Sequence, residues 1–172
     1  STIKTYKTTV GGQTLTGSAP TAGTMSSGTK TVTVTVTDSR GRTAKQTKTL
    51  TVIPYAAPAI RGMSVSRSLA DGTENYEGTN CKIGFGYTIS TLGSKNTSKY
   101  VLEYKAKSAT TWTKLKEGTG YVLSDTVITG AVMNIDSSYD VRLSITDYFG
   151  TVRKTVEVPT AFTLIDFNAS GK

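Results

Sequence analysis

Few residues in this sequence are equipped to do chemistry. It contains no histidine and one cysteine, Cys81, among 172 residues. Histidine is the commonest general base and a common metal ligand, and a single cysteine cannot form an internal disulfide. Serine and threonine are abundant, but a hydroxyl nucleophile needs a positioned base, and no lysine or carboxylate forms such a pattern with one. The sequence therefore predicts no enzyme, no catalytic residue and no cofactor.

Three aspartates in the last third of the chain are the best candidates for metal ligands. Asp136, Asp140 and Asp147 could offer oxygens to a calcium ion. Calcium loops are densely acidic, whereas strand residues separate these three side chains. Turn and capping roles are favoured for all three, and we expect no metal site.

Exposed aromatic and basic side chains offer a different chemistry, that of surface contact. Tyr148 and Phe149 lie where a hairpin tip is expected, and could stack on sugar rings or contact a partner protein. The alternative is packing against a seam between domains. Arg40 and Arg42 occupy the equivalent tip nearer the N-terminus and could meet anionic wall polymers, although solubility explains them equally well.

The formal charge of +8 raises the question of a nucleic-acid partner. The lysines and arginines are scattered over turns and the polar phase of strands, as on solvated faces and protected sheet edges. Basic residues interleaved with stacking aromatics are not seen. No run approaches the roughly 18 apolar residues of a membrane helix. We expect neither nucleic-acid binding nor membrane insertion.

The elements that must position these residues are strands. In TVTVTVTDSRGRTAKQTKTLTV (31–52), valines alternate with threonines, a tight polar segment follows, and a second threonine-rich run ends in Leu50 and Val52. This pattern predicts a β-hairpin with one apolar face. No window of a dozen residues shows a helical apolar period. The predicted fold class is all-β.

A second hairpin resembles the first. In VTVTDSRGR and SITDYFGTV, a Thr-Asp pair closes the strand and a glycine follows three residues after the aspartate, giving Asp38 with Gly41 and Asp147 with Gly150. Aspartate bonds its own turn backbone and glycine accepts positive φ. The aspartates are 109 residues apart, about the length of one immunoglobulin-like sandwich. We interpret each hairpin as the last two strands of a sandwich.

Domain boundaries follow from this repeat. Pro54 and Pro58 in IPYAAPAI deny ladder hydrogen bonds and stiffen a short connection. The first domain is expected to span 1–54 and the second 55–160. Segment 161–172 is expected to be a linker or the start of a following module, with an extra strand or tail on the second domain as the alternative.

About seven strands are expected in the second domain, from alternation in RGMSVSR, CKIGFGYTI, YVLEYKA, TTWTKL, LSDTVIT and the terminal hairpin. YVLEYKAKSATTWTKL resembles the third strand and following hairpin of fibronectin type III modules. Tyr139 is placed like the tyrosine corner of such sandwiches, whose hydroxyl bonds upstream backbone. The resemblance implies that Trp112 is a core residue and Tyr139 a corner residue.

A narrower resemblance rests on TVTVTVTDSRGRTAKQTKTLTVIPYAAPAI and ITDYFGTVRKTVEVPTAFTLIDFNASGK. Together they are similar to the tandem immunoglobulin- or fibronectin-like region of minor structural proteins in the tails of long-tailed phages and prophages of Gram-positive bacteria. The resemblance implies spacer modules or cell-surface contacts, without a catalytic motif. It implies a virion location after synthesis in the bacterial cytoplasm, with other tail subunits and host surface glycans as partners, and leaves a homo-oligomer open.

The first domain is short for a sandwich. Few inward aliphatics are available, and they could face one sheet with no evident second sheet to cover them. We expect the Val32, Val34 and Val36 face to be poorly covered within the chain or covered by another copy, and the first strands of this sandwich to lie upstream.

Two classes of function are consistent with these observations. The favoured one is a noncatalytic structural and interaction module of a phage tail. The alternative is a stalk or adhesin module of a bacterial cell-surface protein. An accessory role beside a hydrolase elsewhere in the polypeptide gains nothing from these residues.

Overall fold

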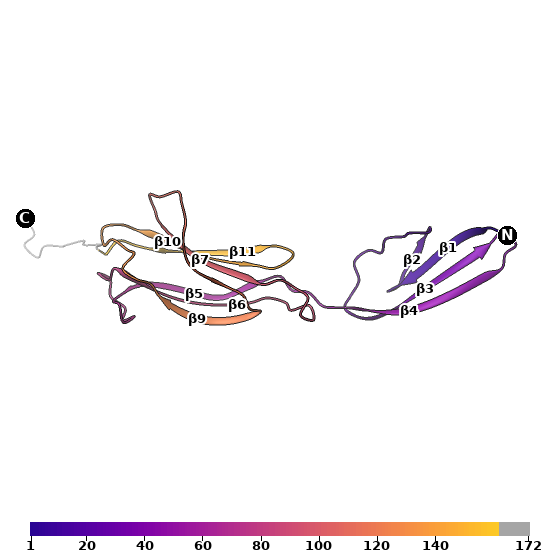
Figure 1. Ribbon diagram of the computed structural model, residues 1–172, viewed down its shortest axis with the longest axis horizontal. Coiled ribbons are helices and arrows are strands. Elements are labelled where there is room, and N and C mark those ends of the chain that lie inside the picture. The colour runs from indigo at the N-terminus through magenta and orange to yellow at the C-terminus, as the bar shows by residue number, and fades with distance from the viewer. Residues whose placement is uncertain (162–172) are drawn as a thin grey trace, which may run out of the picture. The chain divides into compact units, whose positions relative to one another are not determined.

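The computed structural model describes residues 1–161 and divides into two compact units (Figure 1). Unit 1 is Ser1–Tyr55, and unit 2 begins at Ala56. Every regular element among the described residues is a β-strand, which confirms the predicted all-β class. The predicted terminal segment 161–172 lies outside the described residues except for Ala161, whose N–H donates to the Ile135 carbonyl (2.7 Å).

Unit 1 is a single antiparallel sheet with the strand order β2-β1-β3-β4. Its strands are β1 (Ile3–Val10), β2 (Gln13–Thr16), β3 (Gly28–Asp38) and β4 (Thr43–Val52). Gly11 and Gly12 form the turn between β1 and β2 with φ of 54° and 81°, values that a two-residue hairpin turn of this kind requires. The predicted 31–52 hairpin is present as β3 and β4.

The two faces of this sheet differ because side chains alternate along each strand. The register places Val32, Val34 and Val36 on one face and the threonines between them on the other. We call the first surface the valine face; it comprises Tyr6, Thr8, Val10, Gln13, Leu15, Lys30, Val32, Val34, Val36, Ala44, Gln46, Lys48, Leu50 and Val52. The three central valines are half-buried, and no second sheet lies among residues 1–55. The face is poorly covered, as expected.

Unit 2 is a sandwich of two antiparallel sheets, with strand orders β11-β10-β7-β8 and β5-β6-β9. Its strands are β5 (Ala59–Ser68), β6 (Asn80–Thr88), β7 (Lys99–Ala106), β8 (Thr113–Gly118), β9 (Val122–Ile128), β10 (Tyr139–Thr146) and β11 (Thr151–Val158). In an immunoglobulin constant domain the fourth strand joins the sheet of the first. Here β8 pairs with β7 instead, which gives the three-on-four arrangement of fibronectin type III modules.

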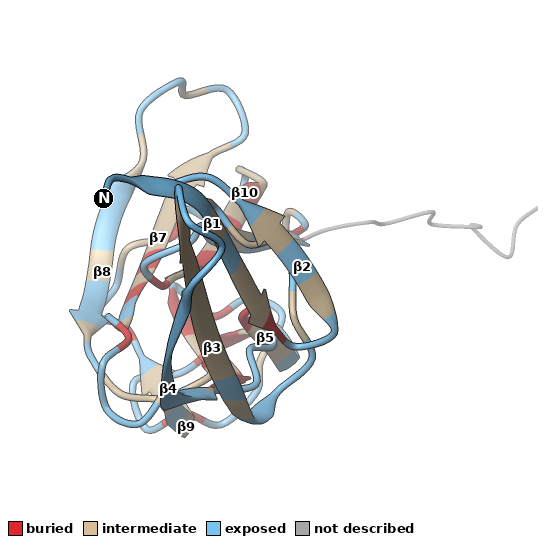
Figure 2. Ribbon diagram, turned by 90° about the vertical axis from the view of Figure 1, so that its right-hand side faces the viewer, coloured by how far each residue is buried: buried red, intermediate tan, exposed pale blue. Residues whose placement is uncertain are grey.

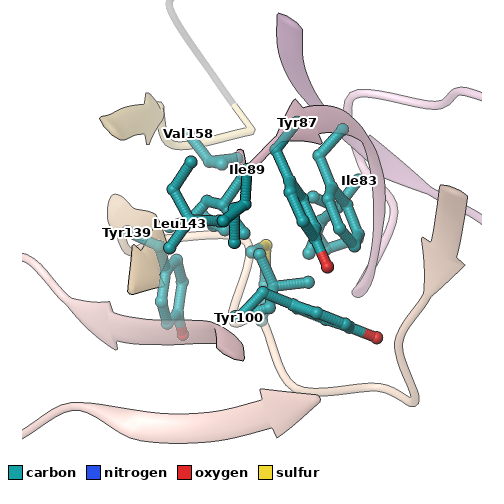
Figure 3. Close-up of a cluster of buried hydrophobic side chains, with 13 residues drawn as sticks. Ile83, Tyr87, Ile89, Tyr100, Tyr139, Leu143 and Val158 are labelled. Carbon is teal, nitrogen blue, oxygen red and sulfur yellow. The ribbon is translucent and has the colours of Figure 1, made fainter. Parts of the chain in front are cut away.

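The core of unit 2 lies between these sheets (Figure 3). On β6 the inward phase is Cys81, Ile83, Phe85 and Tyr87, all buried, and on β10 it is Val141, Leu143 and Ile145, all with no exposed surface. Leu143 pairs with the equally buried Leu102 of β7. In Figure 2 most of the buried residues belong to unit 2, whereas β3 and β4 of unit 1 are intermediate or exposed.

The tyrosine corner is confirmed, but the assignment of Trp112 to the core is wrong. The Tyr139 hydroxyl accepts a hydrogen bond from the Asn134 N–H, five residues upstream (2.8 Å). Trp112 is half-buried outside the core, with the Arg142 guanidinium 3.9 Å from its ring centroid. Trp112 lies just before β8, and Leu115 within that strand packs against the core in its place.

The two repeated hairpins also differ at their glycines. Gly41 has φ of 79°, as expected, in a turn closed by a hydrogen bond from the Asp38 N–H to the Arg42 carbonyl (3.0 Å). The second turn is one residue shorter, since the Asp147 N–H donates to the Gly150 carbonyl (2.9 Å). Gly150 has no positive φ, so the expectation of a left-handed glycine holds at the first hairpin and fails at the second.

A buried arginine organises one end of the sandwich. Arg67, near the end of β5, is only 5% exposed. Its guanidinium donates to four backbone carbonyls at 2.7–3.2 Å, those of Gly78, Asn134, Ser137 and Pro159. Carbonyl dipoles thereby replace the water that a buried cation loses. The side chain ties two loops to the residue that follows β11.

Candidate interaction site

The tip of the β10–β11 hairpin presents the two aromatic residues singled out by the sequence. Tyr148 and Phe149 form its two-residue turn, and the Asp147 carboxylate holds the turn by accepting from the N–H groups of Phe149 (2.8 Å) and Gly150 (2.9 Å). Tyr148 is 76% exposed and Phe149 60% exposed. Their ring centroids are 5.2 Å apart at an interplanar angle of 83°, an edge-to-face pair.

A buried asparagine fixes this tip to a neighbouring loop. Asn96, 6% exposed, donates from Nδ2 to Asp147 Oδ2 (3.2 Å) and to the Ser90 carbonyl (2.6 Å). Its Oδ1 accepts from the Tyr148 N–H (3.2 Å), and its backbone carbonyl accepts from the Tyr121 hydroxyl (2.6 Å). The aromatic turn therefore stands on an anchored base. We call Tyr148, Phe149, Asp147 and Asn96 the aromatic tip.

The loop that supplies Asn96 has an unusual backbone. Leu92, Gly93 and Ser94 are three successive residues with positive φ, at 48°, 64° and 65°. For residues other than glycine such a conformation costs on the order of 1–3 kcal/mol each and persists only where the surroundings impose it. The surroundings thus hold the loop in a strained conformation, and the loop leads directly to Asn96 of the aromatic tip.

Sequence reasoning missed Asn96, Leu92 and Ser94. The turn composition of TLGSKNTS identified a loop, and the loop is present. Nothing in the spacing indicates that residue 96 meets residue 147, because 51 positions separate them. The pairing depends on the sandwich topology, which brings this loop beside the β10–β11 turn.

The predicted basic contacts lie on unit 1 and differ from each other. At the β3–β4 tip, Asp38 Oδ1 accepts from the N–H groups of Arg40 and Arg42, both at 2.9 Å. The Arg42 guanidinium also forms an ion pair with Asp38 (2.7 Å) and donates to the Ser1 hydroxyl (3.0 Å). The guanidinium of Arg42 is thus committed to the turn, although both arginines are exposed.

Charge is distributed unequally between the units. Unit 1 holds seven of the 20 lysines and arginines but only Asp38 of the 12 acidic residues, so six of the eight net positive charges belong to it. In unit 2 most charges meet partners, as in the Arg142–Glu103 pair (2.8 Å) and the Lys116–Asp125 pair (2.7 Å) that joins β8 to β9. Tyr148 and Phe149 are the uncharged residues among the candidate contacts.

The described residues contain no group of three or more His, Cys, Asp or Glu side chains that could hold a metal ion. Burial raises the pKa of the Cys81 thiol to about 12, although the nearby Arg67 charge opposes this shift, so the thiol is not an activated nucleophile. Among residues 1–161 no helix is long and apolar enough to cross a membrane.

Comparisons with known proteins extend this description only slightly. No protein-family model matches the chain, and no curated protein matches it. Among solved structures it is similar to "Crystal structure of domains A168-A170 from titin", at 17% sequence identity and a TM-score of 0.37. The match covers 77% of this chain and 39% of that chain. The three-on-four strand order defines unit 2 as an immunoglobulin-like, fibronectin type III-like sandwich.

Proposed function

We propose that this chain is a noncatalytic module of a phage tail, which spaces the adsorption apparatus and contacts a host surface glycan through Tyr148 and Phe149. The observation that carries the proposal is the aromatic tip: two largely exposed rings on a turn anchored by a buried asparagine. Exposed aromatic faces stack on the apolar faces of sugar rings. A fixed base lowers the conformational entropy lost on binding.

The phage tail assignment draws its support from the resemblance of the two hairpins and the C-terminal stretch. Under this proposal the protein belongs to the virion, outside the cell, with other tail subunits as neighbours. In the described residues both units consist of strands joined by turns and loops, with a short connection between the units.

The test is binding of the fluorescently labelled chain to whole Gram-positive cells at low and high salt. We expect saturable binding that survives high salt, since stacking is little screened. The double variant Tyr148→Ala/Phe149→Ala should reduce affinity about tenfold or more, since fully burying one such apolar side chain contributes about 1.5–3 kcal/mol. Tyr76→Ala is the matched control, because Tyr76 is another exposed aromatic of unit 2 (70%).

Two outcomes would contradict the proposal. One is equal binding by the double variant and by Tyr76→Ala, which would remove the aromatic tip from recognition. The other is binding that disappears at modest salt, which would reduce the contact to the general attraction of a cationic protein for an anionic wall.

A further inference from the structure

The valine face of unit 1 has the form of half a sandwich core. Its rows run across the sheet, with Tyr6 beside Val36 and Val36 beside Ala44 in one row, and Val32 beside Lys48 in another. An apolar groove of about 390 Å³ lies over this face, lined by Val32, Val34, Gln46, Lys48, Thr49 and Leu50. Only Val10 is fully buried among the described hydrophobic residues of unit 1.

The opposite face does not share this character. Its rows are threonines, with Thr9 beside Thr33 and Thr33 beside Thr47, and lysines at Lys7 and Lys45. An antiparallel sheet with one apolar and one polar face packs the apolar face on a second layer and leaves the other in water. The sequence of unit 1 therefore specifies which face is to be covered, and a covering sheet would lie about 10 Å away.

The charge on the valine face constrains what can cover it. Lys48 is exposed at the groove on edge strand β4, and Lys30 donates to the neutral Ser26 hydroxyl (2.9 Å). Asp38, the single acid of unit 1, is already paired with Arg42. A second copy of this unit would oppose six net positive charges to six, which disfavours association between copies.

We propose that the valine face docks a second β-sheet with an apolar face and net negative charge, supplied by a neighbouring protein, whose carboxylates reach Lys48 at the rim. The apolar side chains of the partner sheet fill the groove. The carboxylates at the edge of the partner sheet complement the positive charge of unit 1 and so favour an acidic partner. The docked pair completes a sandwich core. This inference is independent of the aromatic tip and of its ligand.

The test uses the whole chain and two synthetic disulfide-closed hairpins as probes. Both hairpins carry valine on one face; the remaining strand positions are glutamate in the acidic hairpin and lysine in the basic one. Fluorescence anisotropy should show saturable binding of the acidic hairpin at physiological salt and none of the basic hairpin.

Two matched pairs of variants locate the contact. Val34→Asp should weaken binding of the acidic hairpin about tenfold or more, whereas Thr33→Asp makes the same charge change on the opposite face and should have less than about a twofold effect. Lys48→Glu and Lys45→Glu form the second pair on β4, with the same expectation. The lysine pair is exposed, so it remains informative if Val34→Asp unfolds unit 1.

Three results would overturn the inference. The first is equal weakening by both members of the lysine pair, which would show attraction to net charge alone. The second is self-association of the wild-type chain in sedimentation that Val34→Asp abolishes and Thr33→Asp preserves, which would make a second copy the occupant. The third is failure of the wild-type chain to bind the acidic hairpin.

Discussion

Units 1 and 2 use the same hairpin motif and the same alternation of apolar and polar residues, yet only unit 2 has a closed core. In unit 2 the inward residues of β10 meet those of β6 and have no exposed surface, as at Leu143 and Ile83. In unit 1 the corresponding valines of β3 are half-buried. Alternation therefore determines a sheet and its apolar face, whereas a core requires two such faces together.

The largest expected effect of the closed core of unit 2 is on the reactivity of its buried cysteine, Cys81. Its pKa is raised from 9.0 to about 12 by burial in unit 2, so at neutral pH the thiolate fraction falls about a thousandfold. We expect thiol-reactive dyes to label native protein at least about a thousandfold more slowly than unfolded protein. Stopped-flow labelling measures this ratio. Fast labelling of Cys81 in mild denaturant, under conditions where the β6 amides are still protected from hydrogen exchange, would contradict the expectation.

Truncation of core side chains should separate the units next. Leu143→Ala removes a fully buried side chain and should destabilise unit 2 by about 3 kcal/mol, within the range for buried leucines. Val34→Ala removes a half-buried side chain and should destabilise unit 1 by about 1 kcal/mol or less. Denaturant unfolding followed by amide exchange in β10 and β3 measures both. Similar costs at the two positions would mean that the valine face is already covered.

The tyrosine corner gives a smaller effect confined to unit 2. Tyr139→Phe leaves the Asn134 N–H without its partner and should cost about 1–2 kcal/mol. Tyr104→Phe is the matched control, since its ring lies 6.2 Å from that of Tyr139 and the same oxygen is removed. Thermal melts of the two variants should differ by several degrees. Coincident melts would show that the corner hydrogen bond adds no stability.

The smallest effect is a pH dependence in unit 1. Partial desolvation raises the pKa of Asp38, but hydrogen bonds from Arg42 and Arg40 outweigh it and hold the pKa below the ordinary 3.8. Because the folded value is the lower one, the carboxylate supports the β3–β4 turn fully above the ordinary value, and this support is lost as pH falls through the folded value. Amide shifts of Arg42 should follow this loss.

Asp38→Asn should abolish that titration while leaving unit 2 unchanged. Since unit 1 contains no other acidic side chain, an unchanged midpoint in the variant would assign the titration to something other than this turn.

The strands of both units were predictable because alternation and turn residues are local signals. Val32, Val34 and Val36 define a face by their period of two, and Gly11 with Gly12 defines a turn by its φ requirement. Unit 2 required more than this, because the pairing of β8 with β7 rather than β9 leaves no local trace in the sequence. The resemblance to fibronectin type III modules supplied that topology.

The errors arose where the role of a side chain depends on contacts with residues that are distant in the sequence. Trp112 was assigned to the core by analogy, but Leu115 packs against the core instead, and the Trp112 ring lies against the Arg142 guanidinium. Asn96 was not identified because its role depends on a contact 51 positions away. The exposure of Tyr148 and Phe149 was foreseeable from their place in a two-residue turn, whereas the rigidity of their support was not.

The Arg67 contacts have a mechanical consequence for unit 2. The chain enters the unit at β5 and leaves it after β11, and these two strands lie against each other. Arg67 near the end of β5 bonds the residue just after β11, so the two strands run in the same direction. The start of β5 and the end of β11, where the chain enters and leaves the unit, therefore lie at opposite ends of the sandwich. A pull along the chain would therefore shear β5 against β11 lengthwise, with the Arg67–Pro159 hydrogen bond among the contacts that resist it.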